Sequence, residues 1–300
     1  MKQRSPFRSI VRLLAVVVVT ACGGSIVVGW LLPQSRHTSP KPLPVELGAE
    51  MVTLALPDVG RLAALYVPAH GPTPESRGAL LLLHGLGGSK NFELHRARFL
   101  QAAGWSTLCL DLPGHGQSDG NAITFGPCES AAAQVALAWL REREPGRPLG
   151  AIGSSLGGAA LALADPPLPV EVMVLEAAFS SLHDAFEARM RVLSGPLATP
   201  VLWLTPLFEL GFRLRTGVDP ETVRPSDHVA HCAAPGCVFL VMHGDADRET
   251  PIDQGRALFA ALPEPKQFWS VPGAAHEDLH LFAPLDYERR LLAFLDEYLR

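Results

Sequence analysis

The alternation of short apolar runs with longer amphipathic stretches is the feature that most limits the folds open to this chain. Runs that predict strands cover residues 51–56, 61–67, 78–85, 105–112, 148–154, 170–178, 237–244 and 266–271. Helical patterns lie near residues 92–103, 128–143, 156–165, 252–261 and 285–299. Uninterrupted apolar strands that alternate with helices are typical of a mainly parallel sheet with helices on both faces. We therefore predict a single α/β domain over residues 51–300.

One long interval interrupts this alternation. After the strand predicted at 170–178, the chain continues for much longer than an ordinary loop before the next strand, and it is rich in Leu, Phe and Trp. We predict a small helical cap at about residues 183–230, above the strand ends. Its Trp203, Phe208 and Phe212 could line an apolar substrate pocket or contact lipid, although packing of cap residues on one another is the simpler explanation.

The charge of the chain excludes one class of partner. The formal net charge is -5, and the body of the chain has no cluster of basic residues. Domains that bind nucleic acid carry a basic patch that neutralises phosphates. We therefore expect no nucleic-acid partner.

An uncharged apolar segment, residues 13–32, precedes the predicted domain. It is about as long as a helix needs to be to cross a bilayer. The basic residues before it are Lys2, Arg4, Arg8 and Arg12. Positive charge on this side predicts a cytoplasmic N-terminus and places the rest of the chain outside the cytoplasm. We expect residues 1–32 to form a single-pass membrane anchor.

A bacterial lipoprotein signal is the alternative for the same segment. The sequence "VTAC", which ends at Cys22, resembles the signal in which a small residue precedes a lipidated cysteine. The apolar run continues to Leu32, which favours the uncleaved anchor. Either way, the domain would be attached to a membrane, and the Pro-rich polar residues 33–50 are expected to form a linker.

Two further cysteines, Cys232 and Cys237, lie close together in the sequence. An extracytoplasmic location would permit a disulfide between them, although separate thiols are the favoured interpretation. His228 and His231 lie beside them, but the spacing matches no standard set of metal ligands. We expect no metal site there.

The sequence Gly153-Ser154-Ser155-Leu156-Gly157 lies where a predicted strand meets a predicted helix. A Gly-x-Ser-x-Gly motif at such a junction predicts a sharp turn with a serine at its tip, and its glycines let the flanking backbone pack closely. The spacing selects Ser155 as the candidate nucleophile. Ser154 occupies the variable position, and we expect its hydroxyl to be incidental.

A serine hydroxyl needs a base that takes its proton and a carboxylate that orients this base. The last two predicted strands are followed by Asp245, Asp247 and Glu249, and by His276 and His280, respectively. The order Ser155, Asp247, His276 is the chain order of such a triad in this kind of architecture.

The oxyanion of an acyl-transfer intermediate needs two hydrogen-bond donors. One candidate is the backbone N–H of Leu156, at the start of the helix that follows the serine. The other is the N–H of Leu86 in "HGLGG", residues 84–88, directly after an earlier strand.

Taken together, these motifs resemble the α/β-hydrolase superfamily, in particular serine hydrolases of the monoacylglycerol lipase and S33 peptidase kind. The segments that carry the resemblance are "HGLGG" (84–88), "DLPGHGQSDG" (111–120), "GSSLGG" (153–158), "HGDADRETP" (243–251) and "GAAH" (273–276). The resemblance covers nearly all of residues 51–300. It implies an α/β-hydrolase fold with a small helical cap and a Ser-His-Asp triad.

The same motifs choose between the candidate residues. The acid loop of the family matches Asp247 better than Asp245, and the histidine loop matches His276 better than His280. Glu176 occupies an alternative acid position that some relatives use, and Asp247 is preferred to it. The resemblance implies neither a metal nor a cofactor.

We therefore predict a membrane-attached serine hydrolase that cleaves carboxylic esters through an acyl-enzyme. A small-molecule ester or a lipid suits an apolar cap close to a membrane. One alternative is an S33-type aminopeptidase, which would need an acidic group near the mouth of its site. A non-catalytic binding protein on the same fold is the other alternative, and the filled catalytic positions disfavour it.

Overall fold

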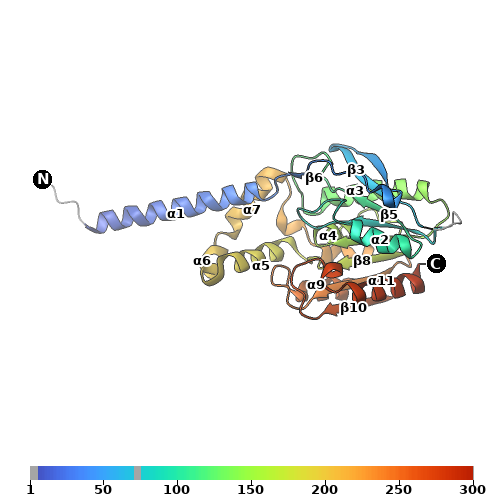
Figure 1. Ribbon diagram of the computed structural model, residues 1–300. Helices are drawn as coiled ribbons and strands as arrows, with labels where there is room; N and C mark the ends of the chain where they lie inside the picture. Colours follow the sequence, from blue (N-terminus) through green and yellow to red (C-terminus); the bar gives the residue numbers. More distant parts are fainter. Residues whose placement is uncertain (1–5, 71–75, 300) are drawn as a thin grey trace.

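The computed structural model describes residues 6–70 and 76–299 of the chain (Figure 1). Its centre is an eight-stranded sheet with the strand order β10-β9-β8-β7-β4-β5-β3-β2. The strands are β2 (Glu50–Leu56), β3 (Gly60–Val67), β4 (Ala79–Leu83), β5 (Ser106–Leu110), β7 (Leu149–Ser154), β8 (Val172–Glu176), β9 (Val238–Gly244) and β10 (Lys266–Val271). Only β3 is antiparallel to its neighbours, β2 and β5, among these strands. The predicted mainly parallel α/β class is confirmed.

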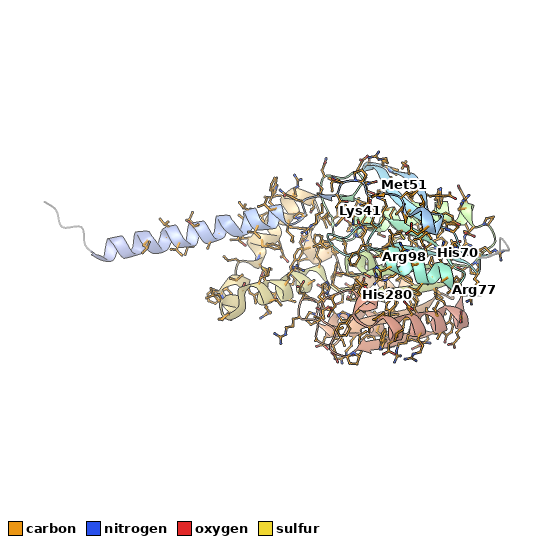
Figure 2. The ribbon with its side chains drawn as sticks, in the orientation of Figure 1. Lys41, Met51, His70, Arg77, Arg98 and His280 are labelled. Atoms are coloured by element: carbon orange, nitrogen blue, oxygen red, sulfur yellow. The ribbon has the colours of Figure 1, made fainter. Side chains whose placement is uncertain are left out.

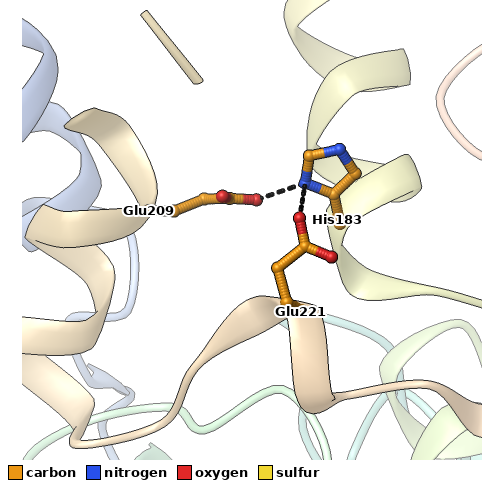
Figure 3. A group of neighbouring side chains, drawn as sticks. All are labelled: His183, Glu209 and Glu221. Atoms are coloured by element: carbon orange, nitrogen blue, oxygen red, sulfur yellow. Dashed lines mark hydrogen bonds and ion pairs between the residues drawn. The ribbon is translucent and has the colours of Figure 1, made fainter. Parts of the chain in front are cut away.

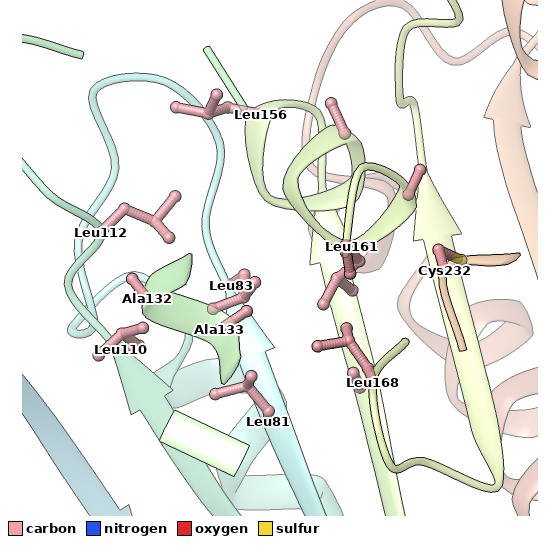
Figure 4. Close-up of a cluster of buried hydrophobic side chains, with 14 of the residues drawn as sticks. Leu81, Leu83, Leu110, Leu112, Ala132, Ala133, Leu156, Leu161, Leu168 and Cys232 are labelled. Carbon is pink, nitrogen blue, oxygen red and sulfur yellow. The ribbon is translucent and has the colours of Figure 1, made fainter. Parts of the chain in front are cut away.

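Alternate side chains of the central strands feed two apolar cores. On β4, Leu81 and Leu83 belong to one core, whereas Leu80 and Leu82 belong to the other, because successive side chains of a strand point to opposite faces. Figure 4 shows the first core around Leu81 and Leu83. This core includes side chains of α3 (Pro127–Arg143), α4 (Leu156–Ala162) and α9 (Ile252–Ala261), and of the segment between β8 and β9. The second core includes side chains of α2 (Leu94–Ala102), α10 (Leu279–Phe282) and α11 (Pro284–Tyr298).

The predicted cap is present between β8 and β9. It consists of α5 (Leu182–Ser194), η2 (Gly195–Leu197), α6 (Ala198–Leu202), α7 (Thr205–Thr216), η3 (Pro220–Thr222), α8 (Pro225–His228) and η4 (Val229–His231). Phe208 and Phe212 pack edge-on against Phe186, whereas Trp203 is 78% exposed. The simpler explanation, packing of cap residues on one another, therefore holds for the two phenylalanines, whereas Trp203 lies largely in solvent.

Helix α1 (Pro6–Leu31) extends away from the body and meets the cap near its C-terminal end (Figure 1). There it crosses α7 so closely that a Cβ at Gly29 would overlap the carbonyl of Phe208, and one at Gly211 would overlap the carbonyl of Ile26. Ser25 Oγ donates to the carbonyl of Leu204 across the same crossing (3.1 Å). Small residues thus allow the two helix backbones to touch.

Helix α1 exposes many apolar side chains, which include Leu13, Val16, Val17, Val18, Val19, Val27 and Val28. Over the residues that the structure describes, no helix reaches the length and hydropathy of a membrane span. Lys2 and Arg4 lie outside the described residues, as do the side chains of Arg8 and Arg12. Cys22 is a free, half-buried thiol.

Residues 33–50 do not form the free linker that their composition predicts. Arg36 and His37 form β1, which pairs in parallel with β6 (His115–Gly116). The segment also forms η1 (Val45–Leu47), and Leu47 and Ala49 are buried in the second core. The composition of a segment shows that it is polar. It does not show whether the backbone N–H and C=O groups form hydrogen bonds with a distant loop, as those of β1 do with β6.

The four cysteines of the body, Cys109, Cys128, Cys232 and Cys237, are free thiols. The possible Cys232–Cys237 disulfide is therefore not formed, and both side chains are buried in the first apolar core. Burial raises the pKa of the Cys232 thiol to about 12. These thiols pack as small apolar groups.

Candidate active site

A sharp turn between β7 and α4 holds Ser155. Its φ of 50° and ψ of -108° are values that non-glycine residues seldom adopt, and such strain concentrates at functional sites. The backbone N–H of Ser155 donates to the carbonyl of Glu176 on the next strand (2.7 Å). A Cβ at Gly153 would lie 2.5 Å from the backbone of Gly157. The predicted role of glycine in this turn is therefore visible as a close backbone approach.

The three residues selected from the sequence meet at the strand ends. Ser155 Oγ lies 3.1 Å from His276 Nε2, and His276 Nδ1 lies 2.7 Å from Asp247 Oδ2. In the neutral tautomer that fits these contacts, Nδ1–H donates to the carboxylate and Nε2 accepts the serine proton. The arrangement can deprotonate Ser155 when a carbonyl group approaches.

The carboxylate of Asp247 is buried and well held. Its Oδ1 accepts the N–H groups of Glu249 and Thr250, at 2.9 and 2.8 Å. Burial opposes its ionisation, but hydrogen bonds from His243 and His276 outweigh burial and lower the pKa of Asp247 to about 2. The carboxylate is therefore charged at neutral pH and can stabilise a protonated His276.

The other candidate acids and bases lie in different contacts. Asp245 accepts the N–H of Gly273 (2.7 Å) and shapes the turn before His276. Glu249 forms an ion pair with Arg189. His280, which Figure 2 labels, lies 2.8 Å from Glu288. None of these three contacts reaches Ser155.

The candidate oxyanion donors border the same space. Leu86 and Leu156 both line the cavity that contains Ser155. Leu156 is the first residue of α4, where a backbone N–H has no partner within its helix. His84 fixes the start of the other loop, since its Nε2 accepts the N–H of Leu112 (3.1 Å). An oxyanion hole requires two such donors, and both residues expected to supply them border the cavity beside Ser155.

Known proteins share this sequence pattern. The family model described as "Serine aminopeptidase, S33" matches residues 74–223. An uncharacterized protein of Mycobacterium tuberculosis (strain ATCC 25618 / H37Rv) is 30% identical over 298 residues, which cover 94% of this chain and 95% of that relative. The chain belongs to the S33 family of α/β-hydrolases.

Solved structures show the same fold. An esterase from Pyrococcus furiosus matches with a TM-score of 0.69 and 18% identity, over 90% of this chain and 99% of that one. An α/β serine hydrolase without a lid, from Xanthomonas campestris, matches with a TM-score of 0.58 and 18% identity, over 87% and 98% of the two chains. Both confirm the predicted α/β-hydrolase fold. The prediction of a hydrolase is supported by membership of the S33 family.

The sequence did not reveal a buried charged network beside the nucleophile turn of the hydrolase. At its centre is Arg96, which is fully buried and forms ion pairs with Glu176 (2.7 Å), Asp278 (2.6 Å) and Glu93 (3.2 Å). The Tyr287 hydroxyl also donates to Glu176. Glu176, the alternative acid, is therefore held by Arg96, whereas His276 contacts Asp247.

The network holds two neighbours of the candidate catalytic residues. Asp278 stands two residues after His276, and Ser154 donates a 2.8 Å hydrogen bond to Glu176. Burial opposes ionisation of Asp278, but hydrogen bonding to His95 and the charge of Arg96 outweigh it and lower the pKa. No motif marks Arg96 or Tyr287, since each lies in an ordinary amphipathic helix. The two adjacent serines are the one sequence feature that points to this network. The Ser154 hydroxyl, which the sequence predicts to be incidental, contacts Glu176.

A cavity of about 420 Å³ opens beside Ser155. Its apolar wall comes mainly from the body and the cap, through Leu32, Leu86, Phe92, Phe125, Leu156, Phe179, Leu182 and Phe186. Its charged wall includes Arg36, Glu176, Arg189, Glu249, Glu277 and Asp278. A pocket with an apolar wall and a few polar groups suits a small organic substrate.

A separate cluster in the cap could hold a cation. His183, Glu209 and Glu221 place their potential ligand atoms within 4.8 Å of one another, and both carboxylates face Nδ1 of His183 (Figure 3). Burial opposes protonation of His183, but the hydrogen bond and charge of Glu209, with the charge of Glu221, outweigh it and raise the pKa. An imidazolium therefore suits the cluster without a metal. None of its residues lines the cavity.

Proposed function

We propose that this hydrolase cleaves carboxylic esters with Ser155 as nucleophile, His276 as general base and Asp247 as the residue that orients His276. The observation that carries the proposal is the pair of contacts, 3.1 and 2.7 Å long, that joins the three side chains at the cavity. A non-catalytic binding protein would have no need for this alignment, nor for the rare backbone conformation of Ser155.

The reaction has two halves. Ser155 Oγ attacks the ester carbonyl while its proton passes to His276 Nε2, and the N–H groups of Leu86 and Leu156 stabilise the resulting oxyanion. The intermediate then expels the alcohol, which takes the proton from His276. Water attacks the acyl-enzyme through the same base, and the acid leaves while Ser155 regains its proton. No step requires a metal or an organic cofactor.

The shape of the site supports a small or medium acyl group. Phe179, Leu182 and Phe186 form an apolar wall next to Ser155, and burial of each additional CH₂ group there is worth about 0.8 kcal/mol. A cavity of about 420 Å³ is at the small end of the range for ligand pockets. We therefore expect the hydrolase to prefer esters with short to medium acyl chains, a class that includes lipid-derived esters.

The first test combines labelling and kinetics on the full chain. We expect a fluorophosphonate probe to modify Ser155, which mass spectrometry of the active-site peptide distinguishes from Ser154. Ser155→Ala should lose labelling and at least about 10⁴-fold of the p-nitrophenyl ester hydrolysis. Retained hydrolysis in Ser155→Ala, or labelling at Ser154 alone, would contradict the assignment.

An S33-type aminopeptidase is the second candidate, and one observation favours it. Glu277 is exposed, lines the cavity and directly follows His276, so it is an acidic group of the kind that could bind a substrate ammonium. Hydrolysis of aminoacyl p-nitroanilides that exceeds ester hydrolysis and falls in Glu277→Gln would support this activity. Equal rates in the two proteins would count against it.

We also propose that α1 attaches the hydrolase to a membrane. The exposed apolar side chains of α1 support this proposal, as does the predicted position of basic residues before it. Cell fractionation with carbonate extraction tests it: attachment predicts that the full chain stays with the membrane pellet. A Cys22→Ala variant separates the two modes of attachment, because only a lipoprotein needs that thiol.

A further inference from the structure

The segment before the sheet supplies part of the cavity wall. Leu32 and Arg36 line the cavity together with Ser155 and His276. The backbone on either side of Arg36 is fixed, because Pro33 accepts the N–H of Ile123 (2.8 Å) and the N–H of Thr38 donates to Gly116 (2.9 Å). The N–H of Arg36 itself donates to Gly114 (2.6 Å). Arg36 therefore has a set position beside the site, although it lies in a segment predicted to be a linker.

The guanidinium of Arg36 lies against the loop that carries Leu86. A Cβ at Gly87 would lie 3.3 Å from Arg36 Nη1, so the side chain packs directly on this residue. On the same loop, a Cβ at Gly85 would lie 3.4 Å from the Cβ of Ser155. One short loop thus contacts the nucleophile with Gly85 and the guanidinium with Gly87.

The charges of the cavity wall leave Arg36 without an acidic partner. Arg189 forms an ion pair with Glu249, and the carboxylates of Glu176 and Asp278 are paired with Arg96, which lies behind the wall. Within residues 6–70 and 76–299, by contrast, no carboxylate lies within ion-pair distance of Arg36. A guanidinium beside a cavity can bind a planar carboxylate or a phosphate through two parallel hydrogen bonds.

We propose that Arg36 forms a subsite for an anionic group of the substrate, a carboxylate or a phosphate, at some distance from the ester that Ser155 attacks. The inference rests on the proposed ester hydrolysis and narrows its substrate class to esters that carry a negative charge. Glu277 also lines the cavity and repels an anion, which leaves the Arg36 side as the favourable position. The apolar wall then holds the uncharged part of the substrate.

The kinetic test compares esters that differ in one charged group. The pair is p-nitrophenyl pentanoate and the mono-p-nitrophenyl ester of glutaric acid, with the p-nitrophenyl ester of 4-phosphonobutanoic acid as the phosphate-like arm. We expect Arg36→Gln to lower kcat/KM for the anionic esters about three- to tenfold, with less than about a twofold change for the neutral ester. Arg36→Lys should retain part of the preference and Arg36→Glu should reverse it.

Two controls separate the subsite from general electrostatics. Arg256→Gln removes an exposed arginine of α9 that pairs with Asp253 and does not line the cavity, so it should leave the preference unchanged. High salt should weaken the preference of the native protein more than that of Arg36→Gln, because screening acts on exposed charges. Equal losses for neutral and anionic esters in Arg36→Gln would overturn the subsite.

A binding test stands apart from catalysis. Calorimetry measures octyl phosphate, octanoate and octanol binding to Ser155→Ala and to Ser155→Ala with Arg36→Gln. We expect the second substitution to weaken binding of the two anions about three- to tenfold and to leave binding of octanol unchanged.

If no ester is cleaved but this pattern appears, the ester-hydrolase proposal fails and the subsite stands. If esters are cleaved but anion binding is independent of Arg36 or absent, the subsite fails alone. The stronger of the two anion effects identifies carboxylate or phosphate as the ligand chemistry.

Discussion

Ser154 Oγ and Glu176 Oε2 are joined by a 2.8 Å hydrogen bond, directly beside the candidate nucleophile. The backbone carbonyl of Glu176 also accepts the N–H of Ser155 (2.7 Å). One residue of β8 therefore holds both serines of the turn, and Arg96 in turn holds the carboxylate of that residue. The turn that carries Ser155 is thus connected to the charged network through Glu176, which lines the cavity, whereas Arg96 does not line it.

Ser154→Ala removes one donor to the carboxylate of Glu176. We expect the free energy of unfolding to fall by about 1 kcal/mol and kcat to fall several-fold, because the turn loses one of its two attachments to Glu176. Urea unfolding and ester kinetics measure the two effects. Unchanged values in both would show that the hydroxyl is incidental, as the sequence alone predicted.

Arg96→Met leaves buried carboxylates without their cation. We expect a loss of about 3 to 5 kcal/mol in the free energy of unfolding, which is the usual cost of breaking a buried ion pair from one side. The matched control is Arg98→Met on the same helix, since Arg98, which Figure 2 labels, forms an exposed ion pair with Glu46. Similar unfolding curves for the two variants would argue against the network as a structural centre.

Asp247→Asn tests the acid of the proposed triad. Burial opposes the charge of Asp247, but hydrogen bonds from His243 and His276 lower its pKa from 3.8 to about 2. A lowered pKa means that this carboxylate stabilises the native protein above about pH 4 and loses its contribution as the pH falls from about 4 to about 2. At neutral pH we expect Asp247→Asn to lower kcat by about 10³- to 10⁴-fold, because the amide carries no charge and its N–H₂ can donate to Nδ1, which favours the wrong tautomer of His276.

The measurement for Asp247 is the difference in unfolding free energy between native protein and Asp247→Asn across this pH range. The difference should be constant from pH 7 to about pH 4 and should shrink below it. A difference that changed mainly between pH 6 and 8 would point to a histidine as the titrating group.

His183 gives the opposite sign of pH dependence. Its folded pKa is raised, because the carboxylates of Glu209 and Glu221 outweigh the effect of burial. Its contribution to stability is therefore complete below about pH 6.5 and is lost as the pH rises through the higher folded pKa. We expect the difference in Tm between native protein and His183→Gln to be larger at pH 6 than at pH 9.

His280 provides the contrast for that experiment. Burial lowers its pKa in spite of the neighbouring Glu288, so the native protein binds fewer protons at this residue than the unfolded chain. Relative to His280→Gln, the native protein should gain stability as the pH rises through about 6.5. The same slope in both histidine variants would contradict these two environments.

The sequence predicted the parts of the site that local rules govern. The elbow at Ser155 follows from glycine spacing at a strand end, and Asp247 and His276 follow from their positions after two parallel strands, which must end at one edge of the sheet. The triad itself stays a prediction until the variants are measured. The α/β class could also be predicted from the sequence, because the spacing of apolar residues differs between strands and helices.

Other features depend on contacts between distant segments, and no local pattern encodes these. Arg96 reads as an ordinary helix residue until β8 and α11 bring Glu176 and Tyr287 to it. Arg36 reads as part of a polar linker until its backbone pairs with the loop at Gly114. In both cases the partner is far away in the sequence, so neither composition nor periodicity predicts the contact.

The crossing of α1 with α7 and the pairing of β1 with β6 connect the N-terminal helix firmly to the body, in contrast to the flexible linker that the sequence predicts. A flexible tether of 18 residues would let the body wander over roughly 25 Å. Here no flexible segment separates the helix from the site, because α1 ends at Leu31 and the next residue, Leu32, lines the cavity. A surface or partner that binds α1 would therefore also fix the position and orientation of the cavity mouth. The membrane attachment proposed for α1 would therefore present the cavity to its substrate in one orientation.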